Sequence, residues 1–135
     1  MRYKFLEHTA DIKFQAQGES LEEVFENSAL ALKEVLIGKE KVSESKSKNI
    51  KILGKDNEAL LYRFLEEFLY LIEAENFIIS KIKKLEIKNN KLTAEILGDK
   101  AENYKIQEHV KAITYNSMYV KKSEKGFKSQ VVLDV

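Results

Sequence analysis

Carboxylate groups near the two ends of the chain are the residues best suited to chemistry. Asp11 directly precedes an alternating apolar segment, and Asp134 follows the apolar run 131–133, one residue before the sequence ends at Val135. If the terminal strand pairs near the first one, both side-chain carboxylates and the α-carboxylate of Val135 converge. Three oxygen donors suit a hard cation such as Ca²⁺, Mg²⁺ or Mn²⁺, and they repel one another without it.

A purely structural explanation covers the same acids. Asp11 can cap a turn, and Asp134 can be a solubilising charge at a strand end. Spacing alone favours this explanation over a metal site. The two histidines, His8 and His109, lie at opposite ends of the sequence and outside any metal-ligand spacing, so pattern alone gives no support for histidine catalysis.

Composition narrows the class of protein. A length of 135 residues fits one domain spanning 1–135, and the absence of cysteine excludes disulfides, thiolate metal sites and cysteine nucleophiles. No glycine-rich phosphate loop, zinc motif or serine elbow occurs. Apolar runs stay well below the ~20 residues of a membrane span, and the N-terminus has no hydrophobic signal region. We expect a soluble, cytoplasmic protein.

The charge balance argues against a dedicated nucleic-acid binder. Lys and Arg together number 23 against 22 Asp and Glu, a formal net charge of +1. Only Arg2 and Arg63 are arginines, the cation best suited to bidentate phosphate and guanine recognition.

The elements that must position these residues begin with two short strands between Tyr3 and Gln17. Ser20 and Glu23 then form a capping-box pattern that starts a helix, and Gly38 suits the left-handed position just past its end. Apolar residues recur between these two signals at the spacing of one helical face.

A second helix is the clearest element in the chain. The Lys/Glu/Ser-rich segment 39–48 before it predicts a solvated loop, followed by a short strand over 49–53. Asp56 or Asn57 can cap the helix. Its apolar residues recur at helical spacing and predict a buried face made of Leu60, Leu61, Phe64, Leu65, Phe68, Leu69 and Ile72.

The remainder is rich in strands. Alternating apolar residues on both sides of Asn89-Asn90 predict a hairpin with a two-residue turn, and further strands are expected over 109–120 and 127–135. Two helices with seven or eight mostly antiparallel strands predict an α+β fold, with the helices packed on the sheet.

Several blocks read together resemble the archease family. The segment 5–12 carries His8-Thr9-Ala10-Asp11, the segment 110–115 reads VKAITY, and the segment 131–135 reads VVLDV, each similar to a family motif. The segments 21–27 and 58–71 resemble the two family helices. The resemblance runs in order along essentially the whole chain, which makes the combination specific although each block alone is weak.

This resemblance implies a fold of duplicated β-α-β-β units and a role as the partner of an RtcB-type RNA ligase. Such a ligase joins an RNA 3′-phosphate or 2′,3′-cyclic phosphate to a 5′-hydroxyl through a guanylylated histidine. The resemblance implies a non-catalytic activator that promotes this guanylylation and multiple turnover in tRNA splicing and RNA repair. Contact with RNA is then expected only indirectly, through the ligase.

The resemblance also implies a divalent-cation site, with Ca²⁺ expected and Mg²⁺ or Mn²⁺ as alternatives. Its ligands are Asp11, Asp134 and Val135, which agrees with the converging carboxylates. Surrounding residues or ligase contacts are expected at four positions: His8, Thr9, Lys111 and Thr114. Two positions depart from the family pattern, because Lys13 stands where many members have glycine and Asn116 where many have histidine.

Two other classes of function stay open at this stage. One is a small metal-dependent phosphohydrolase using Asp11 and Asp134, against which the lack of a general base near the acids weighs. The other is a chaperone-like or RNA-binding module, against which the neutral charge and the few arginines weigh. Activity of the protein with metal and phosphorylated substrates, without the ligase, distinguishes an enzyme from an activator.

Overall fold

A computed structural model describes residues 2–6 and 11–135. The elements in chain order are β1 (Tyr3–Leu6), β2 (Ile12–Gly18), α1 (Leu21–Ile37), β3 (Lys46–Leu53), α2 (Asn57–Glu75), β4 (Phe77–Lys88), β5 (Lys91–Lys100), the short 3₁₀ helix η1 (Ala101–Asn103), β6 (Ala112–Ser123) and β7 (Gly126–Asp134). The strands form two antiparallel sheets, one of four strands and one of three.

The fold consists of one β-α-β-β unit inserted into another. The inner unit is β3-α2-β4-β5, with strand order β3-β5-β4. The outer unit is β2-α1-β6-β7, with strand order β2-β7-β6 and β1 added beside β2. In both units the last strand lies between the first two. This confirms the α+β class and the duplicated unit, and it shows that the first copy is interrupted between α1 and β6.

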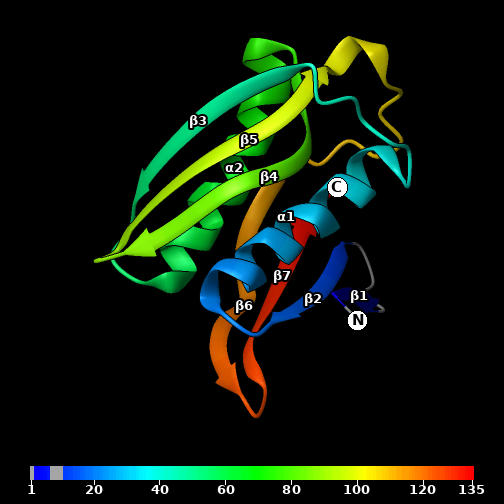
Figure 1. Ribbon diagram of the computed structural model, residues 1–135. Helices are drawn as coiled ribbons and strands as arrows, with labels where there is room; N and C mark the ends of the chain where they lie inside the picture. The colour runs from blue at the N-terminus through cyan, green and yellow to red at the C-terminus, as the bar shows by residue number, and fades with distance from the viewer. Residues whose placement is uncertain (1, 7–10) are drawn as a thin grey trace.

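Both helices lie between the two sheets (Figure 1). α1 packs against β2 and β7 of the four-stranded sheet and against β4 of the other, while α2 packs against β6, β3 and β4. The core consists of buried aromatic and aliphatic side chains, and its fully buried aromatic members include Phe14, Phe25, Phe64 and Phe77. No helix among the described residues is long and apolar enough to cross a membrane.

Local capping chemistry sets where each helix begins. The Ser20 hydroxyl accepts a hydrogen bond from the amide of Glu23 at 3.1 Å, and the Glu23 carboxylate accepts one from the amide of Glu19 at 3.2 Å. The Asp56 carboxylate accepts from the amide of Ala59 at 2.8 Å, which identifies Asp56 as the cap of α2. Both predicted starts are confirmed, since a cap needs only residues that are close in sequence.

Two details of the helices differ from prediction. Gly38 has a positive φ of 69°, but its ψ of −148° is outside the left-handed helical region. On α2 the buried residues include Leu71, whereas Leu69 and Ile72 are only partly buried. The buried surface of α2 is displaced from the predicted stripe because this helix contacts both sheets.

The prediction of a solvated loop over residues 39–48 is wrong in part. β3 begins at Lys46, which pairs with Gly98, and Val42 is buried in the core with 2% of its surface exposed. The Ser80 hydroxyl donates a hydrogen bond to the Val42 carbonyl at 2.8 Å. Lys/Glu/Ser composition did not reveal these contacts because the partners are distant in sequence.

The sequence pattern also missed the first half of β4. This strand starts at Phe77, directly after α2, where three consecutive residues are buried. Two register shifts against β5, between Ile79 and Lys81 and between Ile82 and Lys84, interrupt the alternation further along the strand. Strand periodicity is therefore absent where the strand is most buried.

Core truncation at Phe64 should destabilise the protein strongly. Its fully buried ring lies 6.1 Å from the ring of Phe25 and 4.9 Å from that of Phe68, measured between centroids. We expect Phe64→Ala to lower the free energy of unfolding by about 3–5 kcal/mol in a urea titration. Lys41→Gln, at an exposed position of the 39–45 loop, should change it by at most about 0.5 kcal/mol. The reverse order would contradict the assigned core.

A second stability prediction concerns Asp99, whose side chain binds the end of the 39–45 loop. Its carboxylate accepts hydrogen bonds from the hydroxyls of Ser45 at 2.7 Å and Tyr104 at 2.8 Å, and these bonds lower the pKa of Asp99 to about 2. The unfolded value is about 3.9. The ionised carboxylate therefore contributes stability above that value, and the contribution is lost as the pH falls through about 2.

We expect Asp99→Asn to lower the thermal midpoint at neutral pH. The difference from the parent protein should shrink below pH ~4 and disappear near pH 2. Circular dichroism melts across this range measure it. An undiminished difference at the acid end would show that the loss arises from shape and not from charge.

Candidate functional site

The pairing of β2 with β7 brings the start of β2 beside the end of β7. Ile12 lies opposite Leu133 in the antiparallel register. Asp11 immediately precedes Ile12, and Asp134 immediately follows Leu133, so the two acids occupy the same end of adjacent strands. Opposed positions of an antiparallel pair project to the same side of a sheet. The strand pairing assumed for the predicted cation site is therefore present, while the cation itself stays a prediction.

The acids are open to solvent to different degrees. Asp134 is exposed, whereas Asp11 and Val135 are half-buried, and the Val135 side chain packs against the core. The main-chain carbonyl of Asp134 accepts a hydrogen bond from the amide of Lys111 at 2.7 Å, and Ala112 pairs with Asp134. The end of β7 is thereby held between β2 and the start of β6.

The other predicted site residues have different surroundings. Lys111 is exposed and lies beside Asp134 through the backbone hydrogen bond just described. The Thr114 hydroxyl donates to the Val132 carbonyl at 2.9 Å and accepts from the amide of Asn116 at 3.3 Å, so it already stabilises the strand. His8 and Thr9, the other two predicted residues, lie outside the described residues.

A wide bulge in β6 adjoins this end of the sheet. Thr114 pairs with Val132 and Tyr119 with Gln130, so four residues of β6 lie opposite a single residue of β7. Ser117 within the bulge has a φ of 57°. Periodicity did not indicate the bulge, which interrupts the regular pairing of β6 after Thr114 until it resumes at Tyr119.

The bulge presents an aromatic side chain that the sequence analysis did not single out. Tyr115 is 55% exposed and stacks on Tyr62 of α2, with ring centroids 4.2 Å apart and planes at 7°. Partial burial, with added repulsion from Tyr62 and Asp56, raises the pKa of the Tyr115 phenol. The stack fixes the bulge against α2.

The two departures from the family pattern are compatible with the fold. Lys13 lies within β2, paired with Leu6 and Val132, and it is not among the described residues with positive φ. A glycine is therefore not required there for backbone reasons. Asn116 is exposed within the bulge, so no buried interaction depends on it.

We call the end of the sheet that carries Asp11, Asp134 and Val135 the acidic end. Its donor chemistry fits a hard cation. Asp11, Asp134 and the Val135 α-carboxylate offer only oxygen ligands, as Ca²⁺ and Mg²⁺ require. Calcium takes about 6–8 oxygens, so water or a partner would have to complete such a site. Within the described residues, no group of three or more His, Cys, Asp or Glu side chains has a metal-holding arrangement. The predicted set differs from such a group because one of its ligands is a main-chain carboxylate.

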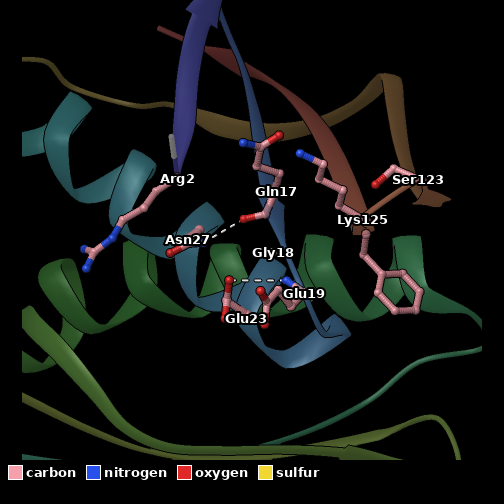
Figure 2. A pocket seen from close by; sticks show the side chains of 9 residues that line it. Arg2, Gln17, Gly18, Glu19, Glu23, Asn27, Ser123 and Lys125 are labelled. Carbon is pink, nitrogen blue, oxygen red and sulfur yellow. Dashed lines mark hydrogen bonds between the residues drawn. The ribbon is translucent and has the colours of Figure 1, made fainter.

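A cavity of about 330 Å³ lies at the other end of β2 (Figure 2). Arg2, Gln17, Glu23 and Lys125 are among the residues that line it. Asn27 closes one side, with its amide donating to the Gln17 carbonyl at 2.7 Å. Because Gly18 and the β6–β7 turn border this cavity, it is separated from Asp11 by the length of the strand.

Known proteins resemble this chain along its whole length. Residues 3–135 match the archease protein family. Protein archease of Methanosarcina mazei is 41% identical over 140 residues, covering 99% of this chain and 96% of the relative, and that of Pyrococcus abyssi is 40% identical over 141 residues, covering 99% of each. The solution structure of Methanobacterium thermoautotrophicum protein 1598 superimposes with a TM-score of 0.84 at 34% identity, with 99% of both chains covered.

Proposed function

This chain belongs to the archease protein family, and from that premise we propose that it activates an RtcB-type RNA ligase without being an enzyme itself. It acts in the cytoplasm, in tRNA splicing and RNA repair, by promoting guanylylation of the ligase histidine and multiple turnover. The observation that supports this proposal best is the β2–β7 pairing, which sets Asp11 and Asp134 side by side at one end of the molecule.

The acidic end is suited to acting on a partner. Asp134 is exposed at the last position of β7, and Lys111 is exposed beside it. A divalent cation held by Asp11, Asp134 and the Val135 carboxylate would neutralise charge on the α-phosphate of a nucleotide in the ligase. The residues of this chain would position the cation, and with it the α-phosphate, relative to the ligase histidine. Alignment of reacting groups contributes a large part of the catalysis of nucleotidyl transfer.

A guanylylation assay tests the proposal. The ligase is incubated with labelled GTP and a divalent cation, with and without this protein, and the covalent ligase–guanylate is quantified. We expect faster guanylylation and more than one RNA-joining cycle per ligase when the protein is present. The protein alone, with the same cation and phosphorylated substrates, should release no product. Release by the protein alone would instead favour a metal-dependent phosphohydrolase.

Removal of one acid should separate cation binding from folding. We expect Asp11→Ala to weaken binding of Ca²⁺ or Mn²⁺ in calorimetry and to reduce ligase activation, because one of few anionic ligands is lost. The circular dichroism spectrum should stay unchanged. Glu124→Ala is the matched control, since it removes an exposed carboxylate from the opposite end of the sheet. Unchanged cation affinity in Asp11→Ala would exclude this site.

The end of the chain offers a second, independent test. Extending the protein beyond Val135 converts its α-carboxylate into a neutral amide carbonyl, a weaker ligand for a hard cation. Asp134→Asn removes charge with almost no change of shape, so it separates electrostatics from bulk. We expect both variants to fold normally and to lose most of the activation of guanylylation. Full activation by the extended protein would rule out the terminal carboxylate as a ligand.

A further inference from the structure

One face of the four-stranded sheet is lined by lysines. Phe14 and Ala16 point into the core, so by strand alternation Lys13, Gln15 and Gln17 point away from the helices. The register places further lysines on that outward side. We call the resulting surface the basic face, formed by Lys4 opposite Gln15, Lys13 itself, Lys128 opposite Gln17, and Lys121 opposite Lys128.

Hydrogen bonds confirm that these strands share one outward surface. The Gln15 side-chain amide donates to the Tyr119 hydroxyl at 3.1 Å and to the side-chain oxygen Oε1 of Gln130 at 2.8 Å, linking β2, β7 and β6. The ammonium of Lys121 lies 4.3 Å from the centroid of the Tyr119 ring. These contacts join outward polar side chains of three strands, while Val132, opposite Lys13 on the same side, is apolar and buried.

The strands that form the basic face carry almost no acids to balance this positive charge. The only acidic residue within the four strands is Asp134, at the far end of β7. None of Lys4, Lys13, Lys121 and Lys128 forms an ion pair with any carboxylate in the described residues 2–6 and 11–135. Lys121 and Lys128 lie directly opposite each other, and like charges in that position are unfavourable.

The three-stranded sheet gives an internal comparison. It also carries many lysines, but Lys48 pairs with Glu75, Lys81 with Glu44, and Lys83 with Glu95. A hollow of about 510 Å³ on its outer side mixes lysines with carboxylates: Lys51, Lys84, Glu86 and Glu95. Three lysines of this sheet therefore pair with carboxylates and others share its outer side with Glu86 and Glu95, whereas the four lysines of the basic face have no ion pair among the described residues.

Two adjoining cavities extend the basic face toward the β6–β7 turn. A cavity of about 220 Å³ is lined by Lys4, Gln15, Gln17 and Lys128. Gln17 also lines the 330 Å³ cavity, where Figure 2 shows the side chains of Gln17 and Lys125 near each other and Arg2 on the opposite side. Glu19 and Glu23 border this second cavity, and the Glu23 carboxylate is already hydrogen-bonded to the Glu19 amide.

We propose that the basic face binds the phosphodiester backbone of RNA. The centre of a protein–protein interface is enriched in aromatic residues, Met and Arg and depleted in Lys, and the basic face has the opposite composition. Lysine ammonium groups contact phosphates as point charges, and such contacts position a strand without reading its sequence. The Tyr119 ring is occupied by Lys121, so base stacking is not the main interaction.

The choice of RNA as the ligand rests on the proposed role beside an RNA ligase. The conclusion that the basic face binds a polyanion rests on its lysines alone. The near-neutral charge of the whole chain argues against a dedicated nucleic-acid binder, because acids elsewhere in the chain offset the lysines of this sheet. Asp11 and Asp134 mark one end of the same sheet, so a strand lying along the basic face would run toward the acidic end.

Fluorescence anisotropy with a labelled single-stranded RNA of mixed sequence ending in a 3′-phosphate tests this inference without the ligase. The test variant is the triple Lys4→Glu, Lys121→Glu, Lys128→Glu. We expect at least about tenfold weaker binding and a loss of roughly two from the slope of log affinity against log salt, at about 0.7 per lost phosphate contact. The glutamine triple at the same positions should show weaker binding too if the glutamate triple fails to fold.

The matched control carries the same charge reversal on the outer side of the other sheet: Lys51→Glu, Lys84→Glu, Lys88→Glu. We expect this control to retain RNA affinity within about threefold, because its three lysines lie outside the basic face and make none of the proposed phosphate contacts. Equal losses in both triples, or no RNA binding by the parent protein, would overturn the inference. If the basic-face triple instead bound RNA normally but failed to promote guanylylation without RNA, the face would bind the ligase and the inference would be wrong.

The same measurements keep the two proposals apart. RNA binding that depends on the basic face, together with no effect on ligase guanylylation, would support the inference while contradicting the proposed function. Loss of activation in Asp134→Asn with unchanged RNA binding would support both, because the acidic end and the basic face would then act separately.

Discussion

The pairing of β7 with β2 on one side and β6 on the other is the interaction on which the four-stranded sheet depends. β1 pairs only with β2, and β6 only with β7, so the sheet divides into separate parts without its central strand. β7 also carries Val131 and Leu133, both fully buried, and its Ser129 hydroxyl lies 2.9 Å from that of Ser28 on α1. The same pairing places Asp11 beside Asp134, so the two acids come together only when β7 has packed into the sheet.

Features that depend on neighbouring residues could be predicted from the sequence. The caps Ser20 and Asp56 use amides three residues away, and the Asn89-Asn90 turn has the expected positive φ values of 51° and 59°. Features that depend on distant partners could not. Val42 is buried because other segments cover it, and β3 extends back to Lys46 because β5 continues to Gly98.

The candidate site shows the same division. The proximity of Asp11 and Asp134 followed from one assumption, that the terminal strand pairs near the first, and the register supports it. The Tyr62–Tyr115 stack and the four-residue bulge had no signal in the sequence, because a bulge interrupts the alternation that identifies a strand. The basic face was hidden for another reason: net charge sums over the whole chain, while the fold places most lysines on strands and most carboxylates outside them.

The insertion of one β-α-β-β unit into the other has a consequence for how the protein is made. The inner unit spans residues 46–100 without interruption, so a nascent chain leaving the ribosome can complete it early. The outer unit must wait, since Ile12 pairs with Leu133 and β7 is synthesised after every other element of the fold. Until then α1 exposes the apolar side that β7 later covers, and closing so long a loop is slow. We therefore expect the middle of this protein to fold before its beginning, with the first strands open to aggregation until β7 has been synthesised.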